Sequence, residues 1–118
     1  MTWSEYLRDI YSLADILSRK VGTCQAVTGL LPDGLIPGFV VSSQIKAPYL
    51  EGPAVAGEIQ SGNQVLVIAG YLGCPEDTAS IAFYRRTTTL AALYVPAQSS
   101  FRPDIYLKEL GSPPEYPY

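Results

Sequence analysis

The segment Val65-Leu66-Val67-Ile68-Ala69 constrains the fold of this 118-residue chain more than any other stretch. It is a continuous apolar run rich in β-branched residues, and the turn residues Ser61-Gly62-Asn63-Gln64 stand directly before it. A strand that lacks polar alternation is buried on both faces, which is typical of a parallel sheet covered by helices. The run therefore predicts an α/β protein with a mostly parallel central sheet flanked by helices.

The rest of the chain alternates helical and strand patterns around this run. Apolar residues at three- and four-residue spacings predict a helix from Ser4 to Lys20, with Ser4 as its N-cap and Gly22 just beyond its end. Further strands are predicted within Thr23–Leu31, Thr88–Val95 and Ile105–Leu107. Further helices are predicted over Leu35–Ser43 and Glu76–Arg86. Lys46–Gly57 is predicted to hold a short strand between loops, and Gly70–Pro75 to be a loop.

The length of the chain suits one domain, and we expect residues 1–118 to form it. No internal repeat or linker interrupts the pattern. The last eight residues, Gly111 to Tyr118, include three prolines, which remove amide donors and fix φ. This tail is therefore predicted to be irregular.

Charge and residue types argue against several classes of function. The net charge is −3 and the eight basic residues form no run, so binding to nucleic acid or to an anionic membrane is not expected. No segment approaches the roughly 20 apolar residues of a membrane span, and the first ten residues do not resemble a signal peptide, so a cytoplasmic location is expected. The chain has no histidine, the commonest general base and metal ligand, and no metal site is expected.

The two cysteines, Cys24 and Cys74, could in principle pair, but two free thiols are the favoured interpretation without a secretion signal. Cys74 precedes a possible helix N-terminus, where the pKa of a thiol can fall, although no histidine is present to pair with it.

Four stretches, in this order, resemble the type I phosphoribosyltransferases, especially the small purine and xanthine salvage members. Trp3–Leu17 resembles the opening helix of the family, and Ala26–Gly38 its first strand with the pyrophosphate loop. Val65–Ser80 resembles the signature strand with the phosphoribosyl-pyrophosphate loop, and Thr89–Tyr106 a later strand and turn. The resemblance implies a phosphoribosyltransferase-like core with a reduced hood and flexible loop, a role in nucleotide metabolism, and association as a homodimer.

The signature loop departs from the family pattern of four apolar residues, two adjacent acids, two variable residues and Asp-Thr-Gly. Val65–Ile68 keeps the apolar part, but Ala69 and Gly70 stand at the acids and Gly73-Cys74-Pro75 at the triplet. In the family the acids act on the ribose hydroxyls, and the triplet holds the 5′-phosphate at a helix N-terminus. Alanine and glycine offer no side-chain oxygen, and proline offers no amide hydrogen.

A second alignment places Asp77-Thr78-Ala79 at the triplet and keeps the hydroxyl of Thr78. The carboxylates of Glu76 and Asp77 would then crowd a bound phosphate. The same two acids also suit the positive end of a helix dipole, so they do not require a ligand.

The pyrophosphate loop departs as well. Pro32-Asp33-Gly34 stands where the family often has Arg-Gly-Gly, and a guanidinium with two open amides suits a diphosphate better than a proline and a carboxylate do. The segment between Tyr49 and Ser61 is also short for the loop that normally closes over the reaction. Together these departures predict a catalytically inactive protein without a cofactor, which acts as a binding, regulatory or structural module.

The alternative is a divergent phosphoribosyltransferase, or a nucleotide or sugar-phosphate binder, that keeps a phosphate site in the 70–78 loop and would use Mg²⁺. An interaction module from another α/β family is a third hypothesis. The predicted partners are a second copy of the chain and either a phosphorylated small molecule or a protein. No catalytic residue is predicted. The candidate ligand-binding residues are Asp33, Gly34, Gly70, Tyr71, Gly73, Thr78 and Tyr106.

Overall fold

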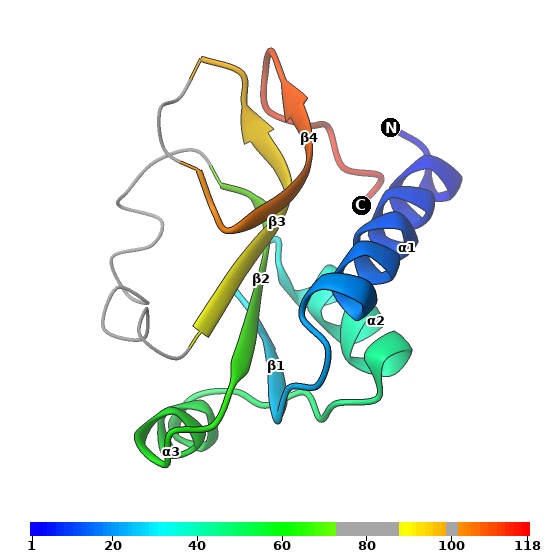
Figure 1. Cartoon of the computed structure of the whole chain (residues 1–118). Helices are drawn as coiled ribbons and strands as arrows, with labels where there is room; N and C mark the ends of the chain where they lie inside the picture. The colour runs from blue at the N-terminus through cyan, green and yellow to red at the C-terminus, as the bar shows by residue number, and fades with distance from the viewer. Residues whose placement is uncertain (73–87, 99–101) are drawn as a thin grey trace.

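The computed structural model describes residues 1–72, 88–98 and 102–118 (Figure 1). The helices are α1 (Trp3–Lys20), α2 (Leu35–Ile45) and α3 (Pro53–Gln60). The strands are β1 (Ala26–Gly29), β2 (Val65–Tyr71), β3 (Thr88–Pro96) and β4 (Ile105–Leu110). The predicted helix Glu76–Arg86 lies outside the described residues.

The four strands form one sheet in the order β1-β2-β3-β4, and each neighbouring pair is parallel. The central strand β2 is buried from Val65 to Gly70, as the continuous apolar run predicts. Helices α1 and α2 cover one face of the sheet, and α3 lies on the other side (Figure 1). The fold is therefore the predicted α/β arrangement with a parallel central sheet.

Helix α1 buries one apolar stripe against the sheet. Its fully or nearly fully buried apolar residues are spaced by three or four positions: Tyr6, Ile10, Leu13, Ala14 and Leu17. The predicted N-cap is wrong, because Thr2 caps the helix and not Ser4. The Thr2 hydroxyl accepts from the Glu5 amide at 3.1 Å, and the Glu5 carboxylate accepts from the Thr2 amide at 3.2 Å. This reciprocal pair satisfies two amides that the helix leaves unbonded.

The main error of the sequence prediction is in the segment 46–57. Only Tyr49 forms a bridge to β1 there, opposite Val27, and the chain then enters α3 at Pro53. Proline suits the first turn of a helix because its missing amide hydrogen has no partner there. The glycine and proline content of the segment, which suggested loops, thus marks a helix start.

Strands β2 and β4 extend beyond their predicted ends, because their hydrogen bonds to neighbouring strands continue past the apolar residues. Gly70 and Tyr71 belong to β2 and not to a loop, since Tyr71 is still in register with Tyr94 of β3. Strand β4 continues to Leu110 because it is the edge strand and can place polar residues toward water. Strand β1 is shorter than predicted.

A buried acid joins α1 to two strands. Asp9 of α1 is 6% exposed, accepts from the Tyr94 hydroxyl at 2.7 Å and pairs with the Lys108 ammonium at 2.9 Å. Tyr94 lies on β3 and Lys108 on β4, so one carboxylate ties three elements together. Both carboxylate oxygens are satisfied, as a buried charge requires.

Residues 111–118 contain no helix or strand but pack back on the start of α1 (Figure 1). The ring of Tyr116 stacks on Tyr118 with centroids 5.2 Å apart and meets the edge of Tyr6 at 5.4 Å. Trp3 lies 6.0 Å from Tyr118. The tail is therefore held by aromatic contacts although it has no regular structure.

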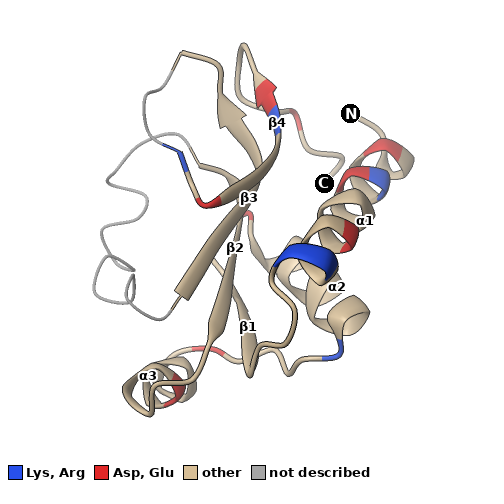
Figure 2. Ribbon diagram, viewed as in Figure 1, with Lys and Arg blue, Asp and Glu red and all other residues tan. Residues whose placement is uncertain are grey.

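Acidic and basic side chains are interspersed over the part of the chain that the structure describes (Figure 2). Within that part, no helix has both the length and the apolar character needed to cross a membrane.

Candidate functional site

The candidate site lies where β1 and β2 end side by side at their carboxyl ends. Leu30 to Gly34 form the loop that leaves β1, called here the 30–34 loop, and its Leu30 amide donates to the Ile68 carbonyl of β2 at 2.7 Å. The Gly34 amide closes the loop onto the Leu30 carbonyl at 2.9 Å. Open parallel sheets bind ligands at this edge, outside the carboxyl ends of the strands.

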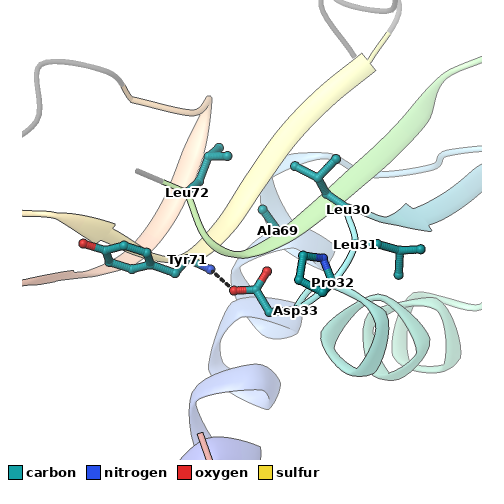
Figure 3. A pocket seen from close by; sticks show the side chains of 7 residues that line it. All are labelled: Leu30, Leu31, Pro32, Asp33, Ala69, Tyr71 and Leu72. Atoms are coloured by element: carbon teal, nitrogen blue, oxygen red, sulfur yellow. Dashed lines mark hydrogen bonds between the residues drawn. The ribbon is translucent and has the colours of Figure 1, made fainter. Parts of the chain in front are cut away.

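The Asp33 carboxylate is the central polar group of this corner. Its Oδ2 accepts from the Tyr71 backbone amide at 2.9 Å and from the Tyr116 hydroxyl at 2.7 Å. Figure 3 shows the side chain turned from the 30–34 loop toward the end of β2. One oxygen thus holds together the loop, the strand end and the C-terminal tail.

Two glycines make room for this arrangement. A Cβ added at Gly70 would lie 2.5 Å from the Asp33 Cγ and 2.7 Å from the Tyr116 hydroxyl oxygen. A Cβ at Gly34 would overlap the backbone carbonyl oxygens of Ile68 and Leu30. The Asp33 carboxylate therefore occupies the space where any side chain at position 70 would begin.

Tyr116 acts as a hydrogen-bond donor in this corner. Burial raises the pKa of its phenol, and the hydrogen bond to Asp33 and the charge of that carboxylate raise the pKa further. The hydroxyl therefore keeps its proton to a higher pH than an exposed tyrosine does. Because the phenol does not readily ionise, its hydrogen bond to the Asp33 carboxylate persists over a wide pH range.

Two hollows open near the carboxyl end of β1. One has a volume of about 130 Å³ and is lined, as Figure 3 shows, by Leu30, Leu31, Pro32, Asp33, Ala69, Tyr71 and Leu72. The other has a volume of about 450 Å³ and is lined by Thr28, Gly29, Leu31, Glu51, Gly52 and Pro53. Leu31 lines both hollows.

The described residues do not fit a magnesium site. Mg²⁺ prefers carboxylate and carbonyl oxygens, but Ala69 and Gly70 bring no side-chain oxygen to the end of β2. Among residues 1–72, 88–98 and 102–118, no group of three or more His, Cys, Asp or Glu side chains could hold a metal ion.

The structure brings together Asp33, Gly34, Gly70 and Tyr71 from the predicted set. The predicted residues Gly73 and Thr78 lie outside the described part of the chain. Tyr106 lies on β4, and β3 separates that strand from β2.

Tyr106 has contacts of its own on the edge strand. Its hydroxyl donates to Glu109 at 3.3 Å, and the Arg102 guanidinium carbon lies 5.6 Å from its ring centroid. These contacts connect it to β4 and to the turn before that strand.

Sequence reasoning missed two residues at this edge. Tyr116 reaches Asp33 across 83 positions, and no local pattern encodes such a contact. Glu51 belongs to no recognised motif and lies in the segment Lys46–Gly57, which the sequence pattern predicts as a short strand between loops. The aromatic tail was a general signal, but it did not specify a partner for Asp33.

No model of a known protein family matches the sequence, and no curated protein sequence matches it. Solved structures do match. A purine phosphoribosyltransferase from Pyrococcus horikoshii has a TM-score of 0.76 and 16% identity, covering 100% of this chain and 91% of that one. A xanthine-guanine-hypoxanthine phosphoribosyltransferase from Helicobacter pylori has a TM-score of 0.70 and 11% identity, covering 92% and 84%.

A third similar structure is a hypothetical protein from Neisseria gonorrhoeae with bound ppGpp. Its TM-score is 0.66 and its identity 16%, and the match covers 93% of this chain and 81% of that one. At these identities the matches show the fold. The chain has the type I phosphoribosyltransferase fold seen in purine phosphoribosyltransferases.

Proposed function

We propose that this chain is a ligand-binding module built on the phosphoribosyltransferase fold, and that it does not catalyse phosphoribosyl transfer. The observation that carries the proposal is the Asp33 carboxylate, which accepts from the Tyr71 amide at 2.9 Å and from the Tyr116 hydroxyl at 2.7 Å. Two hydrogen-bond donors at the carboxyl edge of the sheet are therefore bonded to Asp33 and are not open to a phosphate ligand.

A diphosphate would meet a like charge at this corner. Two unit charges about 4 Å apart repel by about 4 kcal/mol at an effective dielectric constant of about 20. Each 1.4 kcal/mol or so is a factor of ten in affinity, so one such repulsion would weaken binding by roughly a thousandfold. Displacing Asp33 would relieve the repulsion but would break both of its hydrogen bonds.

The end of β2 also lacks the groups that would hold a ribose. Ala69 and Gly70 carry no side-chain oxygen that could accept a hydrogen bond from a ribose hydroxyl. The Gly70 position cannot gain a side chain without moving Asp33, because its Cβ would lie 2.5 Å from the Asp33 Cγ. Binding without turnover is therefore the function that this edge supports best.

A second candidate is a nucleotide binder that holds a phosphate at residues 70–78, of which 73–78 lie outside the described part of the chain. The bound ppGpp in the Neisseria gonorrhoeae neighbour favours it, because that protein has a similar fold and holds a guanine nucleotide. A saturable rise in melting temperature with ppGpp, lost in Thr78→Val, would support this candidate.

The predicted homodimer is part of the proposal. Exposed apolar side chains at four-residue spacing on α1 support it: Trp3 is 47% exposed, Leu7 36% and Tyr11 47%. Three such residues form a stripe that a partner could cover. Sedimentation velocity would show a dimer that Leu7→Glu converts to a monomer, and a monomeric wild type would contradict this part of the proposal.

The test of function is a pyrophosphate-release assay. Phosphoribosyl pyrophosphate and Mg²⁺ are supplied with adenine, guanine, hypoxanthine or xanthine, and an active purine phosphoribosyltransferase serves as the positive control. We expect no base-dependent release above background. Release that requires a base and rises in proportion to the protein concentration would overturn the proposal.

A further inference from the structure

Two carboxylates line the hollows at the site without a cationic partner among the described residues. Asp33 lines the smaller hollow and Glu51 the larger, and the described linings contain no lysine or arginine. Other acids do have a basic partner, as Asp9 has Lys108 at 2.9 Å and Asp15 has Arg19 at 2.9 Å. The charge at this edge is therefore negative and uncompensated within the described part of the chain.

One oxygen of the Asp33 carboxylate, Oδ1, accepts no hydrogen bond from the described residues and is available to a ligand donor. Both of its hydrogen bonds end on Oδ2, and Figure 3 shows its other oxygen turned away from the Tyr71 amide. Asp33 is half-buried, and the other lining residues, Leu30, Leu31, Pro32, Ala69, Tyr71 and Leu72, bring no positive charge to the smaller hollow. A half-buried carboxylate oxygen without a donor is satisfied best by a charged hydrogen-bond donor.

We propose that this edge binds an aliphatic primary amine, with its ammonium group on Asp33 Oδ1 and its hydrocarbon stem against Leu31. The inference rests on the proposed binding function and names the chemical class of its ligand.

The geometry selects an ammonium over other donors. A guanidinium or a vicinal diol engages both oxygens of a carboxylate, and Oδ2 of Asp33 already accepts two hydrogen bonds. An ammonium is a compact point charge that needs one oxygen. A phosphate would be repelled by both Asp33 and Glu51.

The volume sets the size of the stem. The smaller hollow, about 130 Å³, holds roughly four groups of the size of water, whose share of liquid volume is about 30 Å³. A short chain of methylenes fits there against Leu31, which is 65% exposed. A longer amine would reach past Leu31 toward the hollow of about 450 Å³, which Leu31 and Glu51 both line. A diamine could then place its second ammonium toward Glu51.

The experiment follows amide resonances of ¹⁵N-labelled protein during titration with n-butylamine, 1,4-diaminobutane and n-butanol at pH 7. We expect both amines to shift the Asp33 and Tyr71 amides saturably, with Kd on the order of 1 mM for a ligand of this size. The alcohol, which has the same stem without the charge, is expected to bind at least about fivefold more weakly than n-butylamine.

Substitutions separate the two carboxylates. Asp33→Asn keeps an oxygen for the Tyr71 amide and should weaken both amines by about fivefold or more. Glu51→Gln should weaken 1,4-diaminobutane and leave n-butylamine unchanged. Asp15→Asn, which removes an exposed acid on α1, is the matched control and should change neither affinity.

The inference is overturned if no amine gives a saturable shift, if n-butanol binds as well as n-butylamine, or if Asp33→Asn binds both amines like the wild type. Absence of amine binding together with absence of pyrophosphate release would remove this inference and leave the proposed function standing. Pyrophosphate release would remove the proposed function whatever the amines do.

Discussion

The carboxylate of Asp33 accepts a hydrogen bond from the backbone amide of Tyr71 at 2.9 Å, although 38 positions separate the two residues. The contact closes the corner between the 30–34 loop and the end of β2. A phosphate-binding edge would leave such an amide open to the ligand. Here the protein supplies its own anion to the amide.

Gly70→Ala tests whether position 70 must stay empty. The new Cβ would lie 2.5 Å from the Asp33 Cγ and 2.7 Å from the Tyr116 hydroxyl oxygen, so both side chains would have to move and lose their hydrogen bond. We expect a loss of about 1–3 kcal/mol in the free energy of unfolding, measured with urea.

The matched control for that change is Gly57→Ala in α3. A Cβ at position 57 meets nothing within 4 Å, and alanine favours a helix over glycine by up to about 1 kcal/mol. The control should therefore be neutral or stabilising. Equal stability of Gly70→Ala and the wild type would show that Asp33 does not occupy this space.

Tyr116→Phe removes the hydroxyl that donates to Asp33 and keeps the ring that stacks on Tyr118 at 5.2 Å. We expect it to lower the free energy of unfolding by about 0.5–1.5 kcal/mol. Tyr106→Phe, which removes an exposed hydroxyl that donates to Glu109 at 3.3 Å, is the comparison and should stay within about 0.5 kcal/mol of the wild type. If the two variants behave alike, the tail contact contributes nothing measurable.

Lys108→Met tests the buried acid Asp9. The change removes the ammonium 2.9 Å from Asp9, which is 6% exposed, and leaves the Tyr94 hydroxyl as its remaining hydrogen-bond donor among these three residues. Removing one partner of a buried ion pair is costly. Because Lys108 is half exposed, we expect a smaller loss than for a fully buried pair, about 2–4 kcal/mol in the free energy of unfolding measured by chemical denaturation.

The comparison is Arg19→Met, which breaks the exposed pair with Asp15. Both side chains of that pair are 69% exposed, so we expect a change of no more than about 0.5 kcal/mol. A Lys108→Met protein as stable as Arg19→Met would contradict a structural role for the Asp9 network.

Alkaline titration tests the burial of the tyrosines. Burial, as the largest cause, raises the pKa of Tyr6, Tyr49, Tyr94 and Tyr116. Unfolded tyrosine loses its proton near pH 10, whereas these folded phenols keep theirs. The resulting stability is fully present below pH 10 and is lost as the pH rises above it.

We therefore expect the free energy of unfolding to fall above pH 10, with part of the phenolate absorbance at 295 nm appearing only as the protein unfolds. In guanidinium chloride the nine tyrosines should ionise together near pH 10. The stability gap between wild type and Tyr116→Phe should narrow as the pH rises. Identical titration curves in native buffer and in denaturant would contradict burial of these phenols.

The architecture could be predicted from the sequence because its strongest signals are local. The run Val65–Ala69 predicted a buried parallel strand, and the spacing in α1 predicted its buried face. Helix α3 was missed because Pro53 and Gly57 suggest loops, although proline is common at a helix start.

The sequence pattern also singled out part of the candidate site. Asp33 and Gly34 lie where the phosphoribosyltransferase pyrophosphate loop often has Arg-Gly-Gly, which drew attention to them. The structure places them beside Gly70 and Tyr71. The role of Asp33 could not be predicted, because it depends on Tyr116 from the far end of the chain and on the side chain that Gly70 lacks. Such contacts follow from the fold and not from spacing.

The central claim is that the Asp33 carboxylate keeps the Tyr71 amide from a diphosphate. Titrating phosphoribosyl pyrophosphate with Mg²⁺ into ¹⁵N-labelled protein, and following the Tyr71 amide resonance, tests it most directly. We predict no saturable shift of that resonance at millimolar ligand. A saturable shift with micromolar Kd, as expected if the diphosphate replaces the carboxylate on the amide, would contradict it.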